Sequence, residues 1–331
     1  MKRKWIYVFV LVVVALVGCK KQPSKAVAQS PVFSADSAYE YIRDQVSFGP
    51  RVPGTMAHYD CAMYLQKKLE GFGWAVRSEQ GLMTDYKGDN QPVYNIIASL
   101  NPQIKQRILL CAHWDTRPWA DEEDDYELRM KPVLGANDGA SGVGVLLEVA
   151  RELGKLQADS VGGNLGVDIV LFDCEDMGTP DFYTGKQTEN TWCLGSQFWS
   201  DNYKKYGTML YHGTKYKYGI LLDMVGGTDA VFPKEYHSME FASQYVEKIW
   251  RNAQRLGYGK YFVDQYCYPI TDDHYYVSTI AGVPCVDIIH YSPDSDTGFA
   301  SFWHTTRDDM SNINKQTLQV VGEVVLATIM N

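Results

Sequence analysis

Four apolar runs in this chain are each followed by acidic residues or histidines, and this repeated pattern most constrains the fold. The runs cover residues 107–112, 167–172, 218–222 and 283–289. They consist mainly of β-branched residues and leucine, which is typical of strands buried on both faces of a sheet. Acids or histidines follow each run, namely His113 and Asp115, Asp173 to Asp176, Asp223, and His290. Because open α/β sheets form their sites beyond the carboxyl ends of the strands, we expect one site at one sheet edge.

Segments with helical spacing lie between and before these runs. We expect helices over 34–46, 58–69, 143–156 and 239–256, the first capped by Ser34 and the second stopped by Gly71. Helices that alternate with doubly buried strands cover both faces of the sheet. The sequence therefore predicts an α/β fold, a single three-layer αβα domain with a central mixed, mostly parallel twisted sheet, over residues 34–331.

The N-terminal segment is predicted to lie outside this domain. Three basic residues precede an apolar run over 5–17, which is too short to span a bilayer comfortably. The run ends in Leu16-Val17-Gly18-Cys19, which resembles a bacterial lipoprotein signal. We expect a signal peptide over 1–18, a lipidated Cys19 with a flexible tether over 19–33, and attachment to the bacterial cell envelope, facing the periplasm. An ordinary secretory signal with an incidental cysteine is the alternative.

Charge and cysteine content narrow the classes of partner and site. The formal net charge is -9, and no basic patch or arginine-rich run is present, which argues against nucleic acid as a partner. The six cysteines beyond Cys19 show no zinc-type pairing, so we expect buried thiols and leave one or two disulfides open. The acid-rich stretch 121–127 is interpreted as a solvated surface.

Three residues at separate places in the chain are candidate zinc ligands. Catalytic zinc takes ligands from His, Cys, Asp and Glu and keeps one position open. Asp138 lies in the small-residue loop 135–142, where an ordinary helix N-cap is the competing interpretation. Glu175 and Asp176 follow a buried strand, so one side chain can bind metal while its neighbour faces substrate. His304 lies in a loop after the last strand and is a further candidate.

The order and spacing of these residues resemble a known group of enzymes. The succession His113-x-Asp115, Asp138, Glu175-Asp176, Asp223 and His304 resembles the M28 clan of zinc aminopeptidases and their relatives, the glutaminyl-peptide cyclotransferases. The resemblance extends from about residue 34 to the end. It implies Asp138, Asp176 and His304 as ligands of the shared zinc and Glu175 as the general base.

Two activities follow from this resemblance. A cyclotransferase would convert the N-terminal Gln of peptides or proteins to pyroglutamate and release ammonia, with one Zn²⁺ polarising the γ-carbonyl and Glu175 moving the proton. A two-zinc aminopeptidase would hydrolyse N-terminal residues, with His113 and Asp223 completing the second metal site. An inactive, substrate-binding lipoprotein is disfavoured because Glu175 and all three ligands are present.

Three local features favour the cyclotransferase. The segment Thr271-Asp272-Asp273-His274 resembles that group's Asp-Asp-His segment, which implies that Asp272 acts with Asp223. Trp303 matches a tryptophan placed against the glutamine side chain, and the segment after Asp223 is also closer to that group. Trp192 is a further candidate for the pocket wall. Asp287 stands where the animal enzymes have histidine, which implies a hydrogen-bond relay through carboxylates alone.

Overall fold

The structure, a computed structural model, describes residues 31–158 and 165–331. The predicted signal peptide, Cys19 and most of the predicted tether lie outside the described residues. Residues Pro31–Asn331 form one compact unit. Among the described helices, none combines the length and apolar character needed to cross a membrane.

A six-stranded sheet in the order β1-β2-β4-β3-β5-β8 forms the centre of this unit. Strands β3, β4, β5 and β8 are parallel, whereas β1 and β2 add an antiparallel edge. The predicted central sheet, mixed and mostly parallel, is therefore confirmed. The strands are β1 (Ala75–Thr84), β2 (Asn90–Leu100), β3 (Gln106–His113), β4 (Gly166–Phe172), β5 (Lys215–Asp223) and β8 (Cys285–Ile289).

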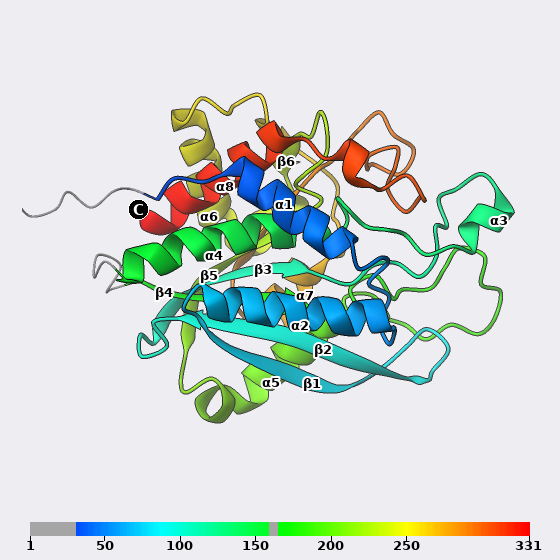
Figure 1. The fold of residues 1–331 in the computed structure, drawn as a ribbon, viewed down its shortest axis with the longest axis horizontal. Coiled ribbons are helices and arrows are strands. Elements are labelled where there is room, and N and C mark those ends of the chain that lie inside the picture. Colours follow the sequence, from blue (N-terminus) through cyan, green and yellow to red (C-terminus); the bar gives the residue numbers. More distant parts are fainter. Residues whose placement is uncertain (1–30, 159–164) are drawn as a thin grey trace, which may run out of the picture. The chain divides into compact units, whose positions relative to one another are not determined.

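Helices cover both faces of the sheet, as the apolar strand runs require (Figure 1). Figure 1 shows α1, α4 and α8 on one side of the sheet and α5 on the other. The first layer contains α1 (Ala35–Val46), α2 (Met56–Gly71), α4 (Ala140–Ala158), α6 (Tyr236–Arg255) and α8 (Lys315–Met330), and the second contains α5 (Leu194–Leu210) and α7 (Asp273–Thr279). Short elements complete the fold, namely α3 (Tyr126–Arg129), η1 (Met310–Asn312) and the two-stranded sheet of β6 (Phe232–Lys234) and β7 (Phe262–Tyr266).

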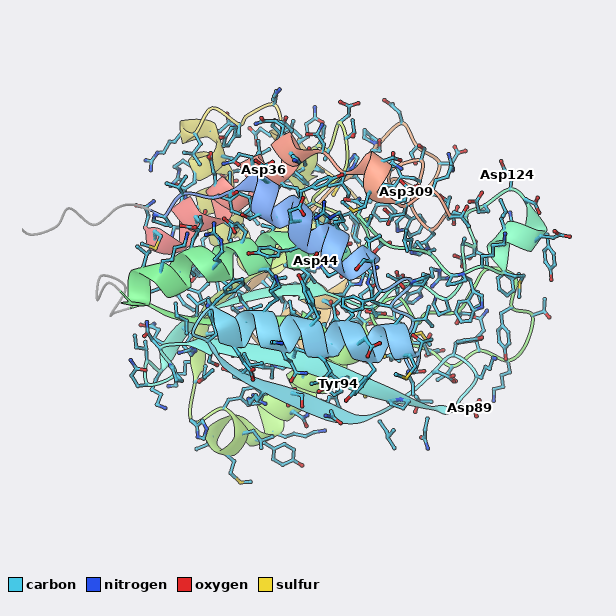
Figure 2. The ribbon with its side chains drawn as sticks, viewed as in Figure 1. Asp36, Asp44, Asp89, Tyr94, Asp124 and Asp309 are labelled. Carbon is cyan, nitrogen blue, oxygen red and sulfur yellow. The ribbon has the colours of Figure 1, made fainter. Side chains whose placement is uncertain are left out.

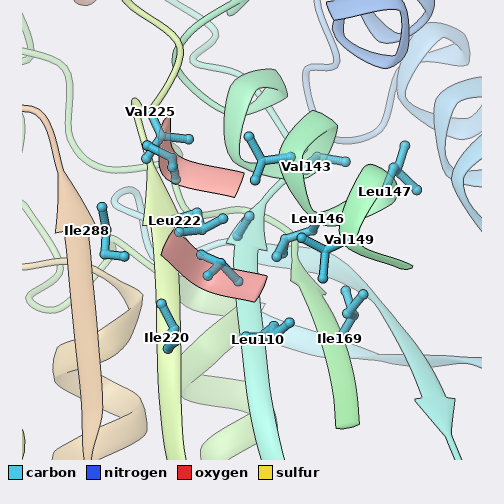
Figure 3. Close-up of a cluster of buried hydrophobic side chains, with 14 of the residues drawn as sticks. Leu110, Val143, Leu146, Leu147, Val149, Ile169, Ile220, Leu222, Val225 and Ile288 are labelled. Atoms are coloured by element: carbon cyan, nitrogen blue, oxygen red, sulfur yellow. The ribbon is translucent and has the colours of Figure 1, made fainter. Parts of the chain in front are cut away.

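Alternate strand residues face the two cores. In β3, Leu110 packs in the larger core, whereas Leu109 and Cys111 pack in the smaller one. Figure 3 shows the larger core, where side chains of α4 lie against those of β3, β4 and β5. A Cβ atom on Gly142 would lie 2.1 Å from the carbonyl oxygen of Leu222, so glycine is required at this approach. The start of α4 is thereby held beside the carboxyl end of β5.

Glu235 connects α6 to the loop that precedes α7. Its side chain is fully buried and accepts hydrogen bonds from the backbone N–H groups of His237, Ser238 and Ile270. It also contacts His274 Nε2 at 3.0 Å. Burial raises the pKa of Glu235, but His274 and the backbone donors outweigh it and lower the pKa to about 2.

We expect Glu235→Ala to lower the free energy of unfolding at pH 7 by about 3–5 kcal/mol, because His274 and three N–H groups lose a buried acceptor. Since the pKa of Glu235 is depressed from 4.5 to about 2, its stabilisation is present above pH 4.5 and is lost as the pH falls through 2. Guanidinium titrations at several pH values should therefore show a shrinking difference below pH 4.5. Exposed Glu240 on the same helix supplies the control, Glu240→Ala. Equal stability of wild type and Glu235→Ala at pH 7 would contradict this role.

Candidate active site

The carboxyl ends of β3, β4, β5 and β8 meet at one sheet edge, where they border a pocket of about 650 Å³. The predicted site residues that line it are Asp138, Glu175, Asp176, Trp192, Asp223, Asp272, Trp303 and His304. His113 lies directly behind this lining, in contact with Asp138 and Asp223. The structure thus brings together residues that are spread over nearly 200 positions of the chain, because parallel strands end at the same edge.

Two of the predicted zinc ligands, Asp138 and Asp176, lie within direct reach of the third, His304. His304 Nε2 is 3.1 Å from Asp176 Oδ1 and 3.5 Å from Asp138 Oδ2. All three side chains are buried. Two ligands on one tetrahedral zinc ion at ordinary bond lengths are separated by roughly 3.3 Å. The donor types, two carboxylates and an imidazole, therefore suit a zinc ion, and both distances from His304 are close to the separation of two ligands on one ion.

The electrostatics of these ligands favour a bound cation. Burial, together with the adjacent carboxylate of Asp176, raises the pKa of Asp138 to about 6. Burial disfavours a charged His304, but Asp176 and Asp121 outweigh it and raise the pKa of His304 to about 9. Carboxylates buried this close together repel, and a divalent cation removes that repulsion.

Asp121 and Arg117 support His304 from behind. Asp121 Oδ1 lies 3.5 Å from His304 Nδ1, and Arg117 forms a buried ion pair with Asp121. Carboxylates of this kind fix the orientation of a metal-binding imidazole. The interpretation of 121–127 as a solvated surface is wrong for Asp121, which pairs with Arg117, and for Glu123, which accepts hydrogen bonds from Thr306, because both are buried. Figure 2 shows Asp124 at the outer edge of the molecule, where the interpretation holds.

Two further carboxylates hold the backbone beneath the ligands. Asp115 accepts hydrogen bonds from the N–H groups of Glu175 and Asp176 at 3.1 and 3.2 Å. Asp308 does the same for Asn137 and Asp138, at 2.8 and 2.9 Å. Neither role was predicted from the sequence. Asp115 was visible two residues after His113, but only the fold shows which amides it faces.

His113 lies between two carboxylates. Its Nε2 atom is 3.0 Å from Asp138 Oδ1 and 3.1 Å from Asp223 Oδ1. These three residues can hold a second metal ion, or His113 can hold both carboxylates by hydrogen bonds while one ion is bound. The geometry is compatible with one or two metal ions.

Glu175 faces the pocket beside a second group of acids. Burial and the neighbouring Asp176 raise the pKa of Glu175 well above its ordinary value. Cys193 Sγ lies 3.2 Å from Glu175 Oε1, and Asp272 offers an oxygen within 4.8 Å of both. Burial and Asp223 also raise the pKa of Asp272. A carboxyl group with a raised pKa suits a residue that accepts and returns a proton near neutral pH.

Two tryptophans form part of the pocket wall. The ring of Trp303 stacks on His304 with a centroid distance of 3.7 Å, and Trp192 lies parallel to His304 at 6.1 Å. The guanidinium of Arg117 lies 4.5 Å from the centre of the Trp192 ring. Both indoles are therefore placed to bound a flat substrate group, Trp303 in direct contact with a candidate ligand.

The structure bears on two expectations about buried residues, the relay at Asp287 and the buried thiols. Asp287 is buried beside His274, with 3.5 Å between Asp287 Oδ2 and His274 Nδ1, so an imidazole joins the carboxylates there. Neither carboxylate oxygen of Asp287 has a hydrogen-bond partner among the described residues, and the relay through carboxylates alone stays a prediction. All six described cysteines are free and buried, which leaves no disulfide between them.

Comparisons with known proteins identify a family and similar enzymes. A model of peptidase family M28 matches residues 95–329. The glutaminyl cyclase of Bacteroides thetaiotaomicron, solved with bound N-acetylhistamine, is 48% identical, with a TM-score of 0.85 over 92% of this chain and 99% of that one. A Zn-dependent exopeptidase from Parabacteroides distasonis is 46% identical, with a TM-score of 0.86 over 92% of this chain and all of that one. The glutaminyl-peptide cyclotransferase of Bothrops jararaca is 25% identical over 83% of this chain and 75% of its own length.

We expect Asp115→Ala to weaken zinc binding by about 10- to 100-fold, because the amides of Glu175 and Asp176 lose the carboxylate that positions them. Competition with a chromophoric chelator measures the affinity. Asp124→Ala, at an exposed acid, is the matched control and should bind zinc like the wild type. An unchanged affinity in Asp115→Ala would show that the ligand loop holds its shape without this support.

Proposed function

The chain belongs to peptidase family M28, and we propose that its pocket acts as a zinc-dependent glutaminyl-peptide cyclotransferase on peptides or proteins with an N-terminal Gln. The observation that carries this assignment is the similarity to the Bacteroides thetaiotaomicron glutaminyl cyclase, which is 48% identical and shares the fold over 92% of this chain. The match to the curated cyclotransferase of Bothrops jararaca supports the same activity from a distant relative. The two-zinc aminopeptidase is less favoured.

Asp138, Asp176 and His304 are the residues proposed to hold the catalytic zinc, and one ion per chain is the proposed stoichiometry. Their spacing and donor types support this choice. A zinc ion bound there supplies a Lewis acid that polarises the γ-carbonyl of the substrate glutamine.

Glu175 is proposed to move the proton. It accepts a proton from the substrate α-amine, whose nitrogen attacks the carbon of the γ-carboxamide. The new N–C bond closes the pyroglutamate ring, the old C–N bond breaks, and Glu175 returns the proton to the departing ammonia. Both reacting groups belong to one substrate, so correct orientation in the pocket supplies much of the rate.

The remaining side chains are proposed to orient the glutamine. Asp223 lies at the end of β5 and can accept a hydrogen bond from the γ-amide nitrogen, with Asp272 beside it. Trp303 offers an aromatic face on which the glutamine side chain packs, and Trp192 closes the wall on the side of Arg117. A hydrophobic wall with a few convergent polar groups is typical of small-substrate pockets.

The aminopeptidase remains a candidate because of one arrangement. His113 contacts Asp138 and Asp223 at distances that suit a second metal ion. In that case Asp138 would bridge two ions and Glu175 would activate water rather than an amine. The two activities differ in substrate, product and metal content.

Incubation of the zinc-loaded protein with Gln-peptides and Leu-peptides tests the assignment. We expect ammonia release and a 17 Da mass loss from the Gln-peptides, because the leaving group is ammonia, and no free leucine. Release of leucine without cyclisation would overturn the assignment.

Glu175→Gln should lower kcat by at least about 10²- to 10⁴-fold, because the proton carrier is lost, while one equivalent of zinc stays bound. Metal analysis of the same samples measures the number of zinc ions bound per chain. Near-normal turnover by this variant, or two equivalents in the wild type, would contradict the proposed mechanism.

We also propose that the protein is anchored to the bacterial cell envelope, facing the periplasm, by a lipid on Cys19. The basic start, short apolar run and Leu16-Val17-Gly18-Cys19 segment support this proposal. We expect Cys19→Ser to move the protein from the membrane fraction to the soluble fraction of cells that process lipoproteins, as immunoblotting can measure. Unchanged membrane association of Cys19→Ser would exclude this mode of anchoring.

A further inference from the structure

The pocket extends well beyond the residues proposed to handle glutamine. Its volume, about 650 Å³, is that of a site for a ligand of several residues rather than for one side chain. The lining also includes residues 268–271 and, from the loop 291–299, Tyr291, Pro293 and residues 295–299. An N-terminal glutamine at the inner end leaves this outer part next to the peptide that follows it.

Three aromatic side chains line one wall of the outer part. Trp303 stacks on His304, and Phe299 packs on Trp303 with a centroid distance of 4.7 Å. Tyr291 adds a third ring, on which Gly298 lies so closely that a Cβ atom would be 2.8 Å from it. The aromatic wall therefore runs from a candidate zinc ligand out to the 291–299 loop.

The 291–299 loop is held in shape by its own hydrogen bonds. The N–H of Ser292 donates to the carbonyl of Gly298 at 2.7 Å, and the N–H of Gly298 donates to the carbonyl of Ser295 at 3.2 Å. A second lining segment leads outward from Asp272 to Tyr268, whose side chain is 77% exposed. Both segments present aromatic surface that a bound peptide can cover.

Asp296 is the charged residue of this outer part. The carboxylates that line the pocket are Asp138, Glu175, Asp176, Asp223, Asp272 and Asp296, and the lining contains no lysine or arginine. The first five belong to the inner site. Asp296 is exposed and makes no hydrogen bond or ion pair within the described part of the chain, so its charge is available to a ligand.

We infer that the outer part of the pocket is a subsite for the second and third residues of the substrate peptide and that Asp296 selects lysine or arginine there over aspartate or glutamate. The inference rests on the proposed cyclotransferase activity. The aromatic wall contacts the aliphatic stem of a long basic side chain, whose charged end reaches Asp296. An acidic side chain at the same place meets a like charge.

Peptides Gln-Xaa-Ala-Ala and Gln-Ala-Xaa-Ala, with Xaa as Lys or Glu, test this preference through the ratio of their kcat/KM values. We expect the wild type to favour Lys over Glu at one or both positions by about 1.5- to 5-fold, as is usual for an exposed charge pair. Asp296→Asn should bring the ratio close to one, and Asp296→Lys should invert it. High salt should reduce the wild-type ratio.

Asp294→Asn is the matched control. Asp294 is an exposed acid of the same loop that does not line the pocket, so its neutralisation changes the net charge equally. It should leave the Lys-to-Glu ratio unchanged. An equal effect of Asp294→Asn and Asp296→Asn would assign the preference to the overall negative charge and overturn the subsite.

A second variant tests the aromatic surface. Tyr268→Ala should lower kcat/KM for the preferred Lys tetrapeptide by about 2- to 10-fold and change that for glutamine amide less, because only the longer substrate reaches Tyr268. Equal losses on both substrates, or no Lys-to-Glu preference in the wild type, would overturn the inference while cyclisation persists. Absence of ammonia release from every Gln-peptide would instead reject the proposed function.

Discussion

The assembly of buried carboxylates around two imidazoles is the interaction on which the rest of this structure depends. His304 contacts Asp138 and Asp176, and His113 contacts Asp138 and Asp223, all at 3.0–3.5 Å. So many acids in one buried place are unfavourable unless positive charge offsets them. The pKa values of Asp138 and His304 are raised because negative charge is concentrated around them. A bound divalent cation supplies the positive charge that offsets it.

The scaffold holds these charges together by hydrogen bonds to backbone amides rather than by ligand contacts alone. Asp115 fixes the amides of Glu175 and Asp176, and Asp308 fixes those of Asn137 and Asp138. Gly142 permits α4 to approach β5, which brings the Asp138 loop to Asp223. Each ligand is therefore positioned by a second element that lies far from it in sequence. Such support keeps a metal site rigid enough for catalysis.

Membership of family M28 does not by itself determine which reaction this site catalyses. The zinc ligands and Glu175 suit both a cyclotransferase and a peptidase, since each activity needs a Lewis acid beside a carboxylate base. The surroundings add an indole stacked on His304 and a carboxyl group of Asp272 near Asp223, which are the features on which the proposed binding of a glutamine side chain rests. The corresponding activity is also that of the Bacteroides thetaiotaomicron glutaminyl cyclase, which this chain closely resembles.

The sequence by itself determined the αβα class, four strands of the parallel part of the sheet and the residues that gather at its edge. Those features depend on apolar runs and on the polar residues that follow them, and both are local patterns. The antiparallel strands β1 and β2 went unpredicted, since their partially exposed residues give a weaker signal. Only the tertiary structure decided that Asp121 is buried by Arg117, that His274 joins Asp287, and that Asp115 and Asp308 support the ligand loops. Except for Arg117 and Asp121, which are four residues apart, these contacts join residues distant in sequence, and a charged side chain is buried only where the fold supplies its partner.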